Sequence, residues 1–154
     1  MILRKAQIED YPNIISLIKE SVFSSCSDDY TLLQLNAWIP KKVDLKRFSS
    51  SLSGCLNLVC VEGEDVVGFI STTTDGYINR LFTHSNYQGR GIATMLLERT
   101  EQWAKSMGLD FLFLDSSITA EKFYLNRGFH EIEKTVLQRD GVELNAILMK
   151  KNIV

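Results

Sequence analysis

The residues best placed to do chemistry lie in one short segment, 84–94, whose sequence is HSNYQGRGIAT. Gly89 and Gly91 let the backbone turn tightly, because neither residue carries a Cβ atom. The apolar periodicity that starts at Ile92 predicts a helix, and the first backbone N–H groups of a helix have no partner within it. Such a helix start binds anions, and Arg90 adds a positive charge. The segment therefore predicts a site for a pyrophosphate group.

The same residues allow other interpretations of this segment. Two glycines at a helix start also occur in an ordinary strand-to-helix turn, and that alternative stays open on local grounds. The dinucleotide-binding fingerprint requires a third glycine and a parallel βαβ unit, and both are missing. The P-loop requires a Gly-Lys-Ser/Thr ending, which is missing too.

The composition limits the other classes of function. The chain has 17 Lys and Arg against 19 Asp and Glu, and its net charge of −2 gives no electrostatic case for nucleic acid. No apolar run approaches the roughly 20 residues that span a bilayer. The N-terminus shows no signal peptide. We therefore expect a cytoplasmic protein with no nucleic-acid or membrane partner.

The cysteines and histidines form no pattern of ligands or nucleophiles. Cys26, Cys55 and Cys60 are odd in number and are interpreted as reduced, structural residues. His84 and His130 belong to no diagnostic motif. Because no Cys, His or Asp cluster has ligand spacing, we expect no metal.

Apolar periodicity predicts the elements that must position segment 84–94. Ile14, Leu17, Ile18 and Val22, for example, have the spacing of an amphipathic helix. We predict helices over residues 9–22, 29–38, 44–51, 91–107 and 118–127, with Pro40 ending the second. We predict strands over residues 2–6, 55–61, 66–73, 77–83 and 111–115, followed by a final hairpin that turns at Asp140–Gly141.

The order of these elements indicates a single α/β (α+β) domain over residues 1–154. An antiparallel meander comes first and helix-crossover units follow it. This order predicts a mixed sheet with helices on both faces.

Two segments of the chain resemble the motifs of a known family. The sequence QGRGIA at 88–93 matches the Gln/Arg-x-x-Gly-x-Gly/Ala signature of the GNAT acetyltransferase superfamily. The sequence AEKFYLNRGF at 120–129 resembles the C-terminal motif of the same family. The predicted order of elements also matches, so the resemblance covers essentially the whole chain. It implies a mostly antiparallel GNAT fold of about seven strands, with strands 77–83 and 111–115 splayed apart.

The resemblance implies where acetyl-CoA would bind. The pantetheine arm of coenzyme A would lie between the splayed strands, where Leu81, Phe82 and Thr83 present backbone groups to it. Tyr124 matches the tyrosine that protonates the leaving thiolate, and would also contact the cofactor. The alternative for Tyr124 is an aromatic residue packed in the core. The residues that would cradle the pyrophosphate are Gln88, Gly89, Arg90, Gly91, Ile92, Ala93 and Thr94.

The chain departs from the family pattern at two places. Ser117 stands where many relatives have an asparagine that reaches the cofactor, and it could instead cap the helix that follows. Tyr77 and Asn79 stand where many relatives carry a carboxylate that acts as general base. Neither is a normal base at neutral pH. Deprotonation could pass through water, Asp115 or His84, so no single carboxylate is expected to be indispensable.

The acceptor is expected to be a small-molecule amine that attacks the thioester directly in a ternary complex. Asp28 or Asp29 could hold a cationic amine, although both could also be solvated caps. Protein N-terminal or lysine acetylation and a non-catalytic acyl-CoA-binding module are the alternative functions. The oligomeric state is expected to be a monomer or homodimer. The residues that could line the acceptor site, or in the case of the aromatic ones simply fill the core, are Phe23, Tyr30, Trp38 and Asn79.

Overall fold

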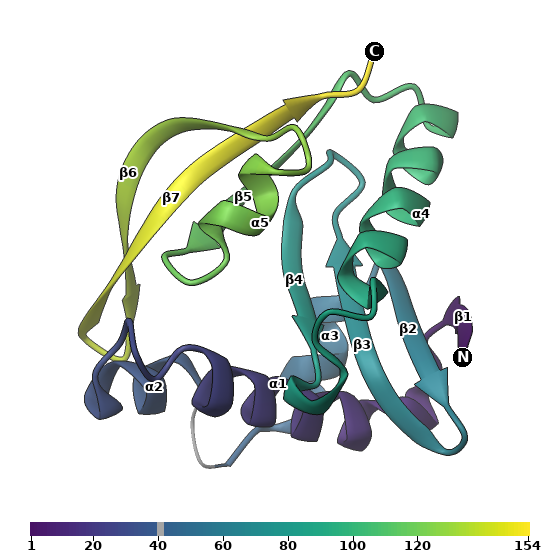
Figure 1. Ribbon diagram of the computed structural model, residues 1–154. Coiled ribbons are helices and arrows are strands. Elements are labelled where there is room, and N and C mark those ends of the chain that lie inside the picture. Colours follow the sequence, from purple (N-terminus) through teal and green to yellow (C-terminus); the bar gives the residue numbers. More distant parts are fainter. Residues whose placement is uncertain (40–41) are drawn as a thin grey trace.

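The computed structural model describes residues 1–39 and 42–154, which form two antiparallel sheets with helices packed against them (Figure 1). The strand order is β1-β2-β3-β4 in the first sheet and β5-β7-β6 in the second. The strands are β1 (Ile2–Lys5), β2 (Leu56–Glu62), β3 (Asp65–Thr72), β4 (Ile78–Thr83), β5 (Phe111–Ser117), β6 (His130–Arg139) and β7 (Val142–Asn152). The predicted α+β architecture of about seven mostly antiparallel strands is confirmed.

The helices fall close to the predicted ranges. They are α1 (Tyr11–Ser25), α2 (Leu32–Trp38), α3 (Leu45–Leu52), α4 (Ile92–Ser106) and α5 (Glu121–Leu125), with 3-10 turns η1 (Ile8–Asp10) and η2 (Ser85–Tyr87). Helix α2 begins three residues later than predicted because Thr31 caps it. The Thr31 side chain accepts the Gln34 N–H, and the Gln34 side chain accepts the Thr31 N–H. The predicted stop at Pro40 lies outside the described residues.

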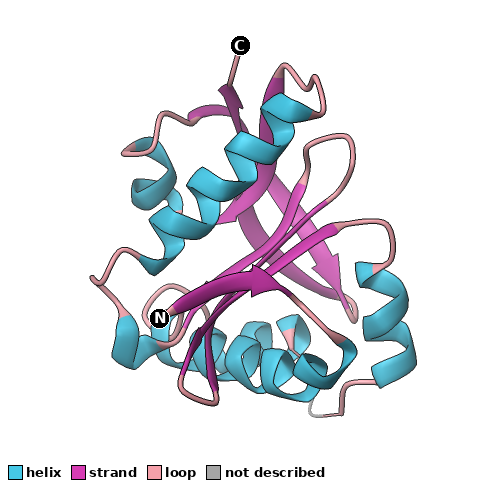
Figure 2. Cartoon of the chain, turned by 90° about the vertical axis from the view of Figure 1, so that its right-hand side faces the viewer, coloured by secondary structure: helices cyan, strands magenta, loops and turns pink. Residues whose placement is uncertain are grey.

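Helices cover both faces of the first sheet (Figure 2), and an apolar core lies on each face. On one face, Leu58 of β2 and Ile70 of β3 pack with α4, and this core continues into β5 and β7. On the other face, Val59 and Phe69 pack with α1 and α3. Neighbouring residues of one strand enter different cores because successive side chains point to opposite faces.

Gly68 of β3 lets α4 lie close to the sheet. A Cβ atom at this position would be 2.5 Å from Cγ2 of Ile92 and 3.1 Å from Cδ1 of Leu96. The missing side chain therefore determines how near the first turns of α4 come to β3.

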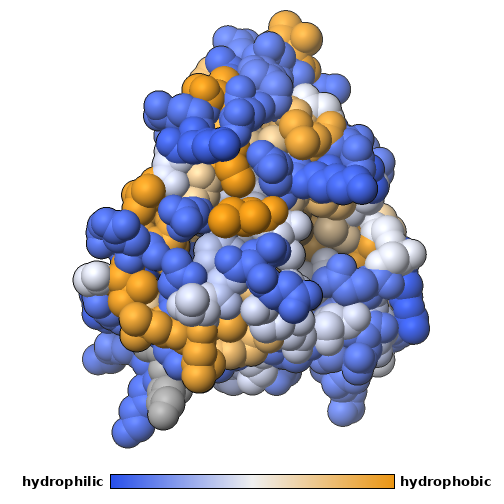
Figure 3. Space-filling model, turned by 60° about the vertical axis from the view of Figure 1, so that its left-hand side comes forward, coloured by the Kyte–Doolittle hydropathy of each residue, from blue (hydrophilic) through white to orange (hydrophobic). Residues whose placement is uncertain are grey.

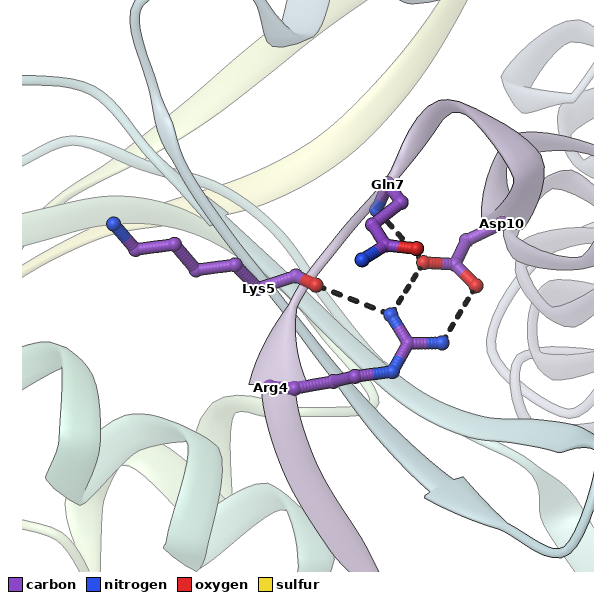
Figure 4. A network of polar contacts seen from close by, with 4 residues as sticks. All are labelled: Arg4, Lys5, Gln7 and Asp10. Carbon is purple, nitrogen blue, oxygen red and sulfur yellow. Dashed lines mark hydrogen bonds and ion pairs between the residues drawn. The ribbon is translucent and has the colours of Figure 1, made fainter.

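A polar network joins the first strand to the first helix (Figure 4). Arg4 donates two hydrogen bonds to the carboxylate of Asp10, at 2.7 and 2.9 Å. The backbone N–H of Gln7 donates a third, at 2.7 Å. The Arg4 guanidinium holds the pKa of the Asp10 carboxyl below its ordinary value. This network directs the chain from β1 into α1.

Strands β4 and β5 lie at the facing edges of the two sheets and diverge. They meet at one parallel bridge between Tyr77 and Phe113, where the Phe113 N–H donates to the carbonyl of Gly76 at 3.0 Å. The pairs within both sheets are antiparallel. Among the described residues, this bridge is the only parallel pairing that remains of the predicted mixed sheet. The predicted pair of splayed strands is present.

Candidate active site

A cavity of about 920 Å³ lies where β4 and β5 diverge. Residues of α1, β4, β5, α5 and β7 line it, so both sheets and their covering helices contribute to its wall. Figure 3 shows a hollow on this side of the molecule with apolar residues inside it and hydrophilic ones around it. A cavity of this size is large enough for a cofactor arm and a small acceptor.

The segment predicted to cradle an anion is the loop that leads into α4. Gly89 and Gly91 have φ angles of 75° and 78°, which residues with a Cβ atom rarely adopt. Gly91 is the N-cap residue of α4 and supplies no side chain to cap the helix. Gln88 and Ala93 line the cavity, while the Ile92 side chain is 1% exposed and packs in the core. The positive end of the helix dipole thus borders the cavity.

The cationic and hydroxyl side chains of the cradle already have protein partners. The Arg90 guanidinium lies 4.8 Å from the ring centre of Tyr87 and 3.9 Å from a carboxylate oxygen of Glu62. The Thr94 hydroxyl accepts hydrogen bonds of 3.0 and 2.8 Å from Arg127 of the α5 end. The cradle therefore offers mainly backbone donors.

The three residues predicted for the pantetheine arm, Leu81, Phe82 and Thr83, line the cavity along the open edge of β4. The Thr83 carbonyl accepts a hydrogen bond of 2.8 Å from the Ser21 hydroxyl of α1. The pairing of β4 with β3 passes from Arg80 to Ile78, so Asn79 is the extra residue of a bulge.

Tyr124 of α5 lines the cavity although it is only 6% exposed. Its ring packs edge-on against Phe123 and Phe129. The structure gives its hydroxyl no hydrogen bond to any described residue. Burial raises the pKa of the Tyr124 phenol, so the hydroxyl stays protonated at neutral pH.

Comparisons with known proteins agree with this fold. A model of the acetyltransferase (GNAT) domain matches residues 26–152. The chain belongs to this family. As a GNAT protein it is an N-acetyltransferase.

Three relatives show the extent of the likeness. The chain is 26% identical over 148 residues to the uncharacterized N-acetyltransferase YafP of Escherichia coli (strain K12), covering 96% of this chain and 93% of that protein. A GCN5-related N-acetyltransferase structure from Rhodopseudomonas palustris is 29% identical, with a TM-score of 0.94 over 98% of this chain and 94% of the other. The PaiA N-acetyltransferase of Thermoplasma acidophilum, solved with coenzyme A, is 23% identical, with a TM-score of 0.78 over 98% of each chain.

In this GNAT chain, Ser117 has a local structural partner. Its hydroxyl accepts a hydrogen bond of 3.1 Å from the backbone N–H of Ala120 and so closes the turn before α5. The Ser116 hydroxyl donates instead to the Ser117 carbonyl at 2.7 Å. Ser117 therefore closes the turn before α5 but does not cap the helix, because the N-cap of α5 is Ala120 and no side-chain cap hydrogen bond is present.

Asp115 and Tyr77 line the cavity and are in contact with each other. The Tyr77 hydroxyl donates a hydrogen bond of 2.6 Å to the Asp115 carboxylate. Burial, reinforced by this carboxylate, raises the pKa of the Tyr77 phenol. Among the described residues that line the cavity, Asp115 is the only Asp or Glu. His84 is not among them, and its Nδ1 faces Glu20 at 3.8 Å.

The structure brings Tyr30, Trp38 and Asn79 to the cavity but not Phe23. Phe23 lies about 200° around α1 from Ser21, which does line the cavity. It is half-buried and packs against the second apolar core, which includes residues of α1 and α3. Because of its position on α1, Phe23 does not reach the cavity and is not among the residues that could contact the acceptor.

Some polar groups on the acceptor side of the cavity already form hydrogen bonds within the protein. The Tyr30 hydroxyl donates to the Asn145 carbonyl at 2.7 Å and accepts the Ile118 N–H at 2.9 Å. The Asp29 carboxylate accepts a hydrogen bond of 2.7 Å from Thr119, whereas Asp28 is exposed. Asp29 therefore ties the α1–α2 loop to the turn before α5.

Two arginines in the cavity wall belong to no motif of the sequence and were not predicted. Arg80 of β4 and Arg139 at the end of β6 both line the cavity. Arg80 lies between two residues that were singled out, Asn79 and Leu81. In a regular strand, alternate residues of β4 would share a face. The bulge at Asn79 interrupts this alternation, so the sequence pattern does not show on which face Arg80 lies.

The cysteines show no sign of reactivity. Cys26 and Cys60 are buried, and burial raises the pKa of both thiols. No group of His, Cys, Asp and Glu among the described residues could hold a metal ion. The same part of the chain contains no helix long and apolar enough to cross a membrane.

Proposed function

We propose that this GNAT protein transfers the acetyl group of acetyl-CoA to a small-molecule amine by direct attack in a ternary complex. The observation that carries the proposal is that the unpartnered hydroxyl of Tyr124, the uncapped start of α4 and the Asp115 carboxylate border one cavity. A donor of protons, an anion cradle and an acceptor of protons are thus available to two substrates at once.

The residues present fit coenzyme A. The first N–H groups of α4 have no side-chain cap, and Gly91 leaves the approach to them open, with no atom within 4 Å of where a Cβ would lie. Acetyl-CoA, when bound, would supply the acetyl group as an activated thioester. The open edge of β4 at Leu81–Thr83 would hold the arm through backbone groups, as an added strand would.

The roles of the side chains follow from their surroundings. Asp115 accepts a proton from the acceptor amine, and the Tyr77 hydroxyl holds its carboxylate in place. Tyr124 donates the proton that the departing sulfur needs. Backbone N–H groups at the β4 bulge stabilise the charge that develops on the carbonyl oxygen. Water and His84 remain the alternatives for the base, but His84 does not line the cavity.

The shape of the acceptor side supports a small molecule. Tyr30 and Trp38 pack edge-on at 5.4 Å, and their rings form part of the cavity wall. Phe48 of α3 and Leu144 of β7 line the same cavity. Apolar walls contributed by elements on several sides suit a small amine with an apolar body.

Turnover of acetyl-CoA with a panel of amines tests the proposal. The panel contains aromatic amines, amino acids, polyamines, aminoglycosides and short peptides. We expect amine-dependent release of free thiol, with a product of acetylated mass for small molecules. Calorimetry with coenzyme A is run in parallel. Coenzyme A binding without thiol release for any amine would favour a non-catalytic module, and turnover of peptides alone would favour a protein acetyltransferase.

A further inference from the structure

We propose that the acceptor amine also carries a carboxylate, which Arg80 and Arg139 bind beside the Tyr77–Asp115 pair. This inference rests on the proposed function, because it names the substrate class of the same cavity. It makes the acceptor an amino acid or a closely similar molecule.

The charges in the cavity wall favour an anionic group on the acceptor. Arg80, Arg139 and Asp115 are the only ionised side chains among the described residues that line the cavity. Asp115 is hydrogen-bonded to Tyr77. The wall therefore has two cations against one anion, and a ligand with several positive charges would be repelled.

Arg80 lacks the partner that a guanidinium in its position normally has. Its side chain is half-buried, with the guanidinium carbon 5.3 Å from the ring centre of Phe48. It makes no hydrogen bond or ion pair with any described residue. Burial and the like charge of Arg139 lower the pKa of Arg80. Buried charges are usually paired, so the missing partner is an anion that the cavity would admit.

Arg139 adds a second set of donors to the same region. One of its nitrogens donates to the Gln138 carbonyl at 2.9 Å. It lines the same cavity as Arg80 and Tyr77. No described carboxylate forms an ion pair with it. The remaining N–H groups of its guanidinium are available to a ligand.

An amino-acid-like acceptor matches this arrangement at both ends. The planar guanidinium matches a carboxylate with two parallel hydrogen bonds. The amine of the same molecule would lie against Asp115, the proposed proton acceptor. Trp38, Phe48 and Leu137 supply apolar wall for a side chain. A polyamine or an aminoglycoside would place positive charge against Arg80 and Arg139 instead.

Matched pairs of ligands test the proposal by calorimetry on the protein with coenzyme A. The pairs are L-phenylalanine and 2-phenylethylamine, L-tyrosine and tyramine, and L-tryptophan and tryptamine, which differ by the carboxylate. We expect at least one amino acid to bind about 10- to 100-fold more tightly than its amine. Arg80→Gln and Arg139→Gln should each remove most of that preference, mainly by weakening the binding of the amino acid.

Arg47→Gln is the matched control. Arg47 is exposed on α3 and does not line the cavity, so its loss removes the same charge from the molecule but not from the cavity. The preference should survive it. If Arg80→Gln does not fold, as judged by circular dichroism, Arg139→Gln decides the outcome, because Arg139 is exposed beside a hairpin turn.

The outcomes separate this inference from the proposed function. Equal binding of amino acids and amines, or no binding by any of the six compounds, would overturn the inference. So would a preference that survives both substitutions. Thiol release from acetyl-CoA is recorded separately. Arginine-dependent amino-acid binding without thiol release would support the carboxylate site and contradict acetyl transfer. Equal turnover of both members of a pair would support acetyl transfer and contradict the carboxylate site.

Discussion

Two tyrosine hydroxyls in the cavity have opposite surroundings. The hydroxyl of Tyr77 donates to the Asp115 carboxylate at 2.6 Å, whereas that of Tyr124 has no partner among the described residues. Burial raises the pKa of both phenols, so both keep their protons at neutral pH. Only the proton of Tyr124 is free to leave for a substrate atom. The same residue type can therefore orient a base at one position and act as an acid at the other.

Tyr124→Phe tests the acid. The substitution keeps the ring and its contacts with Phe123 and Phe129 but removes the proton. We expect kcat to fall about 10²- to 10⁴-fold while coenzyme A affinity stays nearly the same. Tyr11→Phe is the control, because Tyr11 packs edge-on against Phe48 outside the cavity wall. Near-normal kcat in Tyr124→Phe would mean that Tyr124 only fills the core.

Asp115→Asn tests the base. The amide keeps the size of the carboxylate and can still accept from Tyr77, but it cannot take a proton. We expect kcat/KM to fall about 100-fold at neutral pH but turnover to stay measurable, because water can still take the proton. Part of the loss should be recovered at higher pH, where more of the acceptor amine is already neutral. Asp110→Asn, at an exposed position just before β5, is the control. An unchanged kcat/KM would indicate deprotonation through water.

At the scale of elements, the start of α4 serves both the core and the cradle. The Ile92 side chain packs beneath the helix against Gly68, while the N–H groups of the first turn lie at the helix end beside the cavity. The position of the cradle therefore depends on how α4 rests on β3. The anion cradle and the packing of α4 on β3 can be tested by separate substitutions.

Gly91→Val tests the cradle. A branched residue at a φ of 78° is strained, although no protein atom lies within 4 Å of the added Cβ. We expect coenzyme A affinity to fall at least about tenfold as the side chain enters the anion site, a loss of about 1.4 kcal/mol. Gly141→Val is matched in φ, at 73°, and in free space, but lies in the β6–β7 turn of the other sheet and outside the α4 loop. Both variants should lose about 1–2 kcal/mol of unfolding free energy. Equal coenzyme A affinities in the two variants would remove the pyrophosphate assignment.

Gly68→Ala tests the seating of α4. The new methyl would be 2.5 Å from Cγ2 of Ile92, so the helix start must move outward. We expect a loss of about 1–3 kcal/mol of unfolding free energy together with weaker coenzyme A binding. Ile92→Ala removes the clashing atom, so the double variant should be more stable than the sum of the two single losses predicts. Strict additivity in denaturant unfolding would show that this contact does not position α4.

At the scale of the whole molecule, the cavity exists because the two sheets are joined through side chains more than through strand pairing. Leu114 of β5 and Met149 of β7 share a core with Leu97 of α4 and Ile70 of β3. Leu144 of β7 belongs to the second core, with α1 and α3. These shared cores hold the diverging edges of β4 and β5 apart, and the space between them is the proposed site.

The Arg4–Asp10 pair makes the stability of this arrangement depend on pH. The pKa of Asp10 is lowered in the folded state, so the pair contributes stability above the unfolded-state pKa and loses it as pH falls through the folded one. Arg4 is 37% exposed, which screens the pair. We expect Asp10→Asn to lose about 1–2 kcal/mol of unfolding free energy at neutral pH. The difference from wild type should vanish in acid, and a difference independent of pH would show that packing, not charge, is responsible.

Local sequence determined much of this protein. The order of strands and helices followed from periodicity, because a residue's preference for a helix or a strand depends mainly on its near neighbours. The hairpin at Asp140–Gly141 was predictable for the same reason, and both residues have the positive φ that such a turn requires, at 50° and 73°. The glycines before α4 likewise predict an anion site from local sequence alone. The roles proposed for the site residues and the single domain over residues 1–154 stay predictions.

Only the tertiary structure decided which side chains share the cavity. Tyr77 and Asp115 are 38 positions apart and meet because β4 and β5 touch at one bridge before they diverge. Arg80 and Arg139 come from different sheets, and the bulge at Asn79 sets the face on which Arg80 lies. Phe23 left the predicted acceptor set because of its angle around α1. Register, bulges and helix rotation are settled by packing between distant segments, and no local pattern records them.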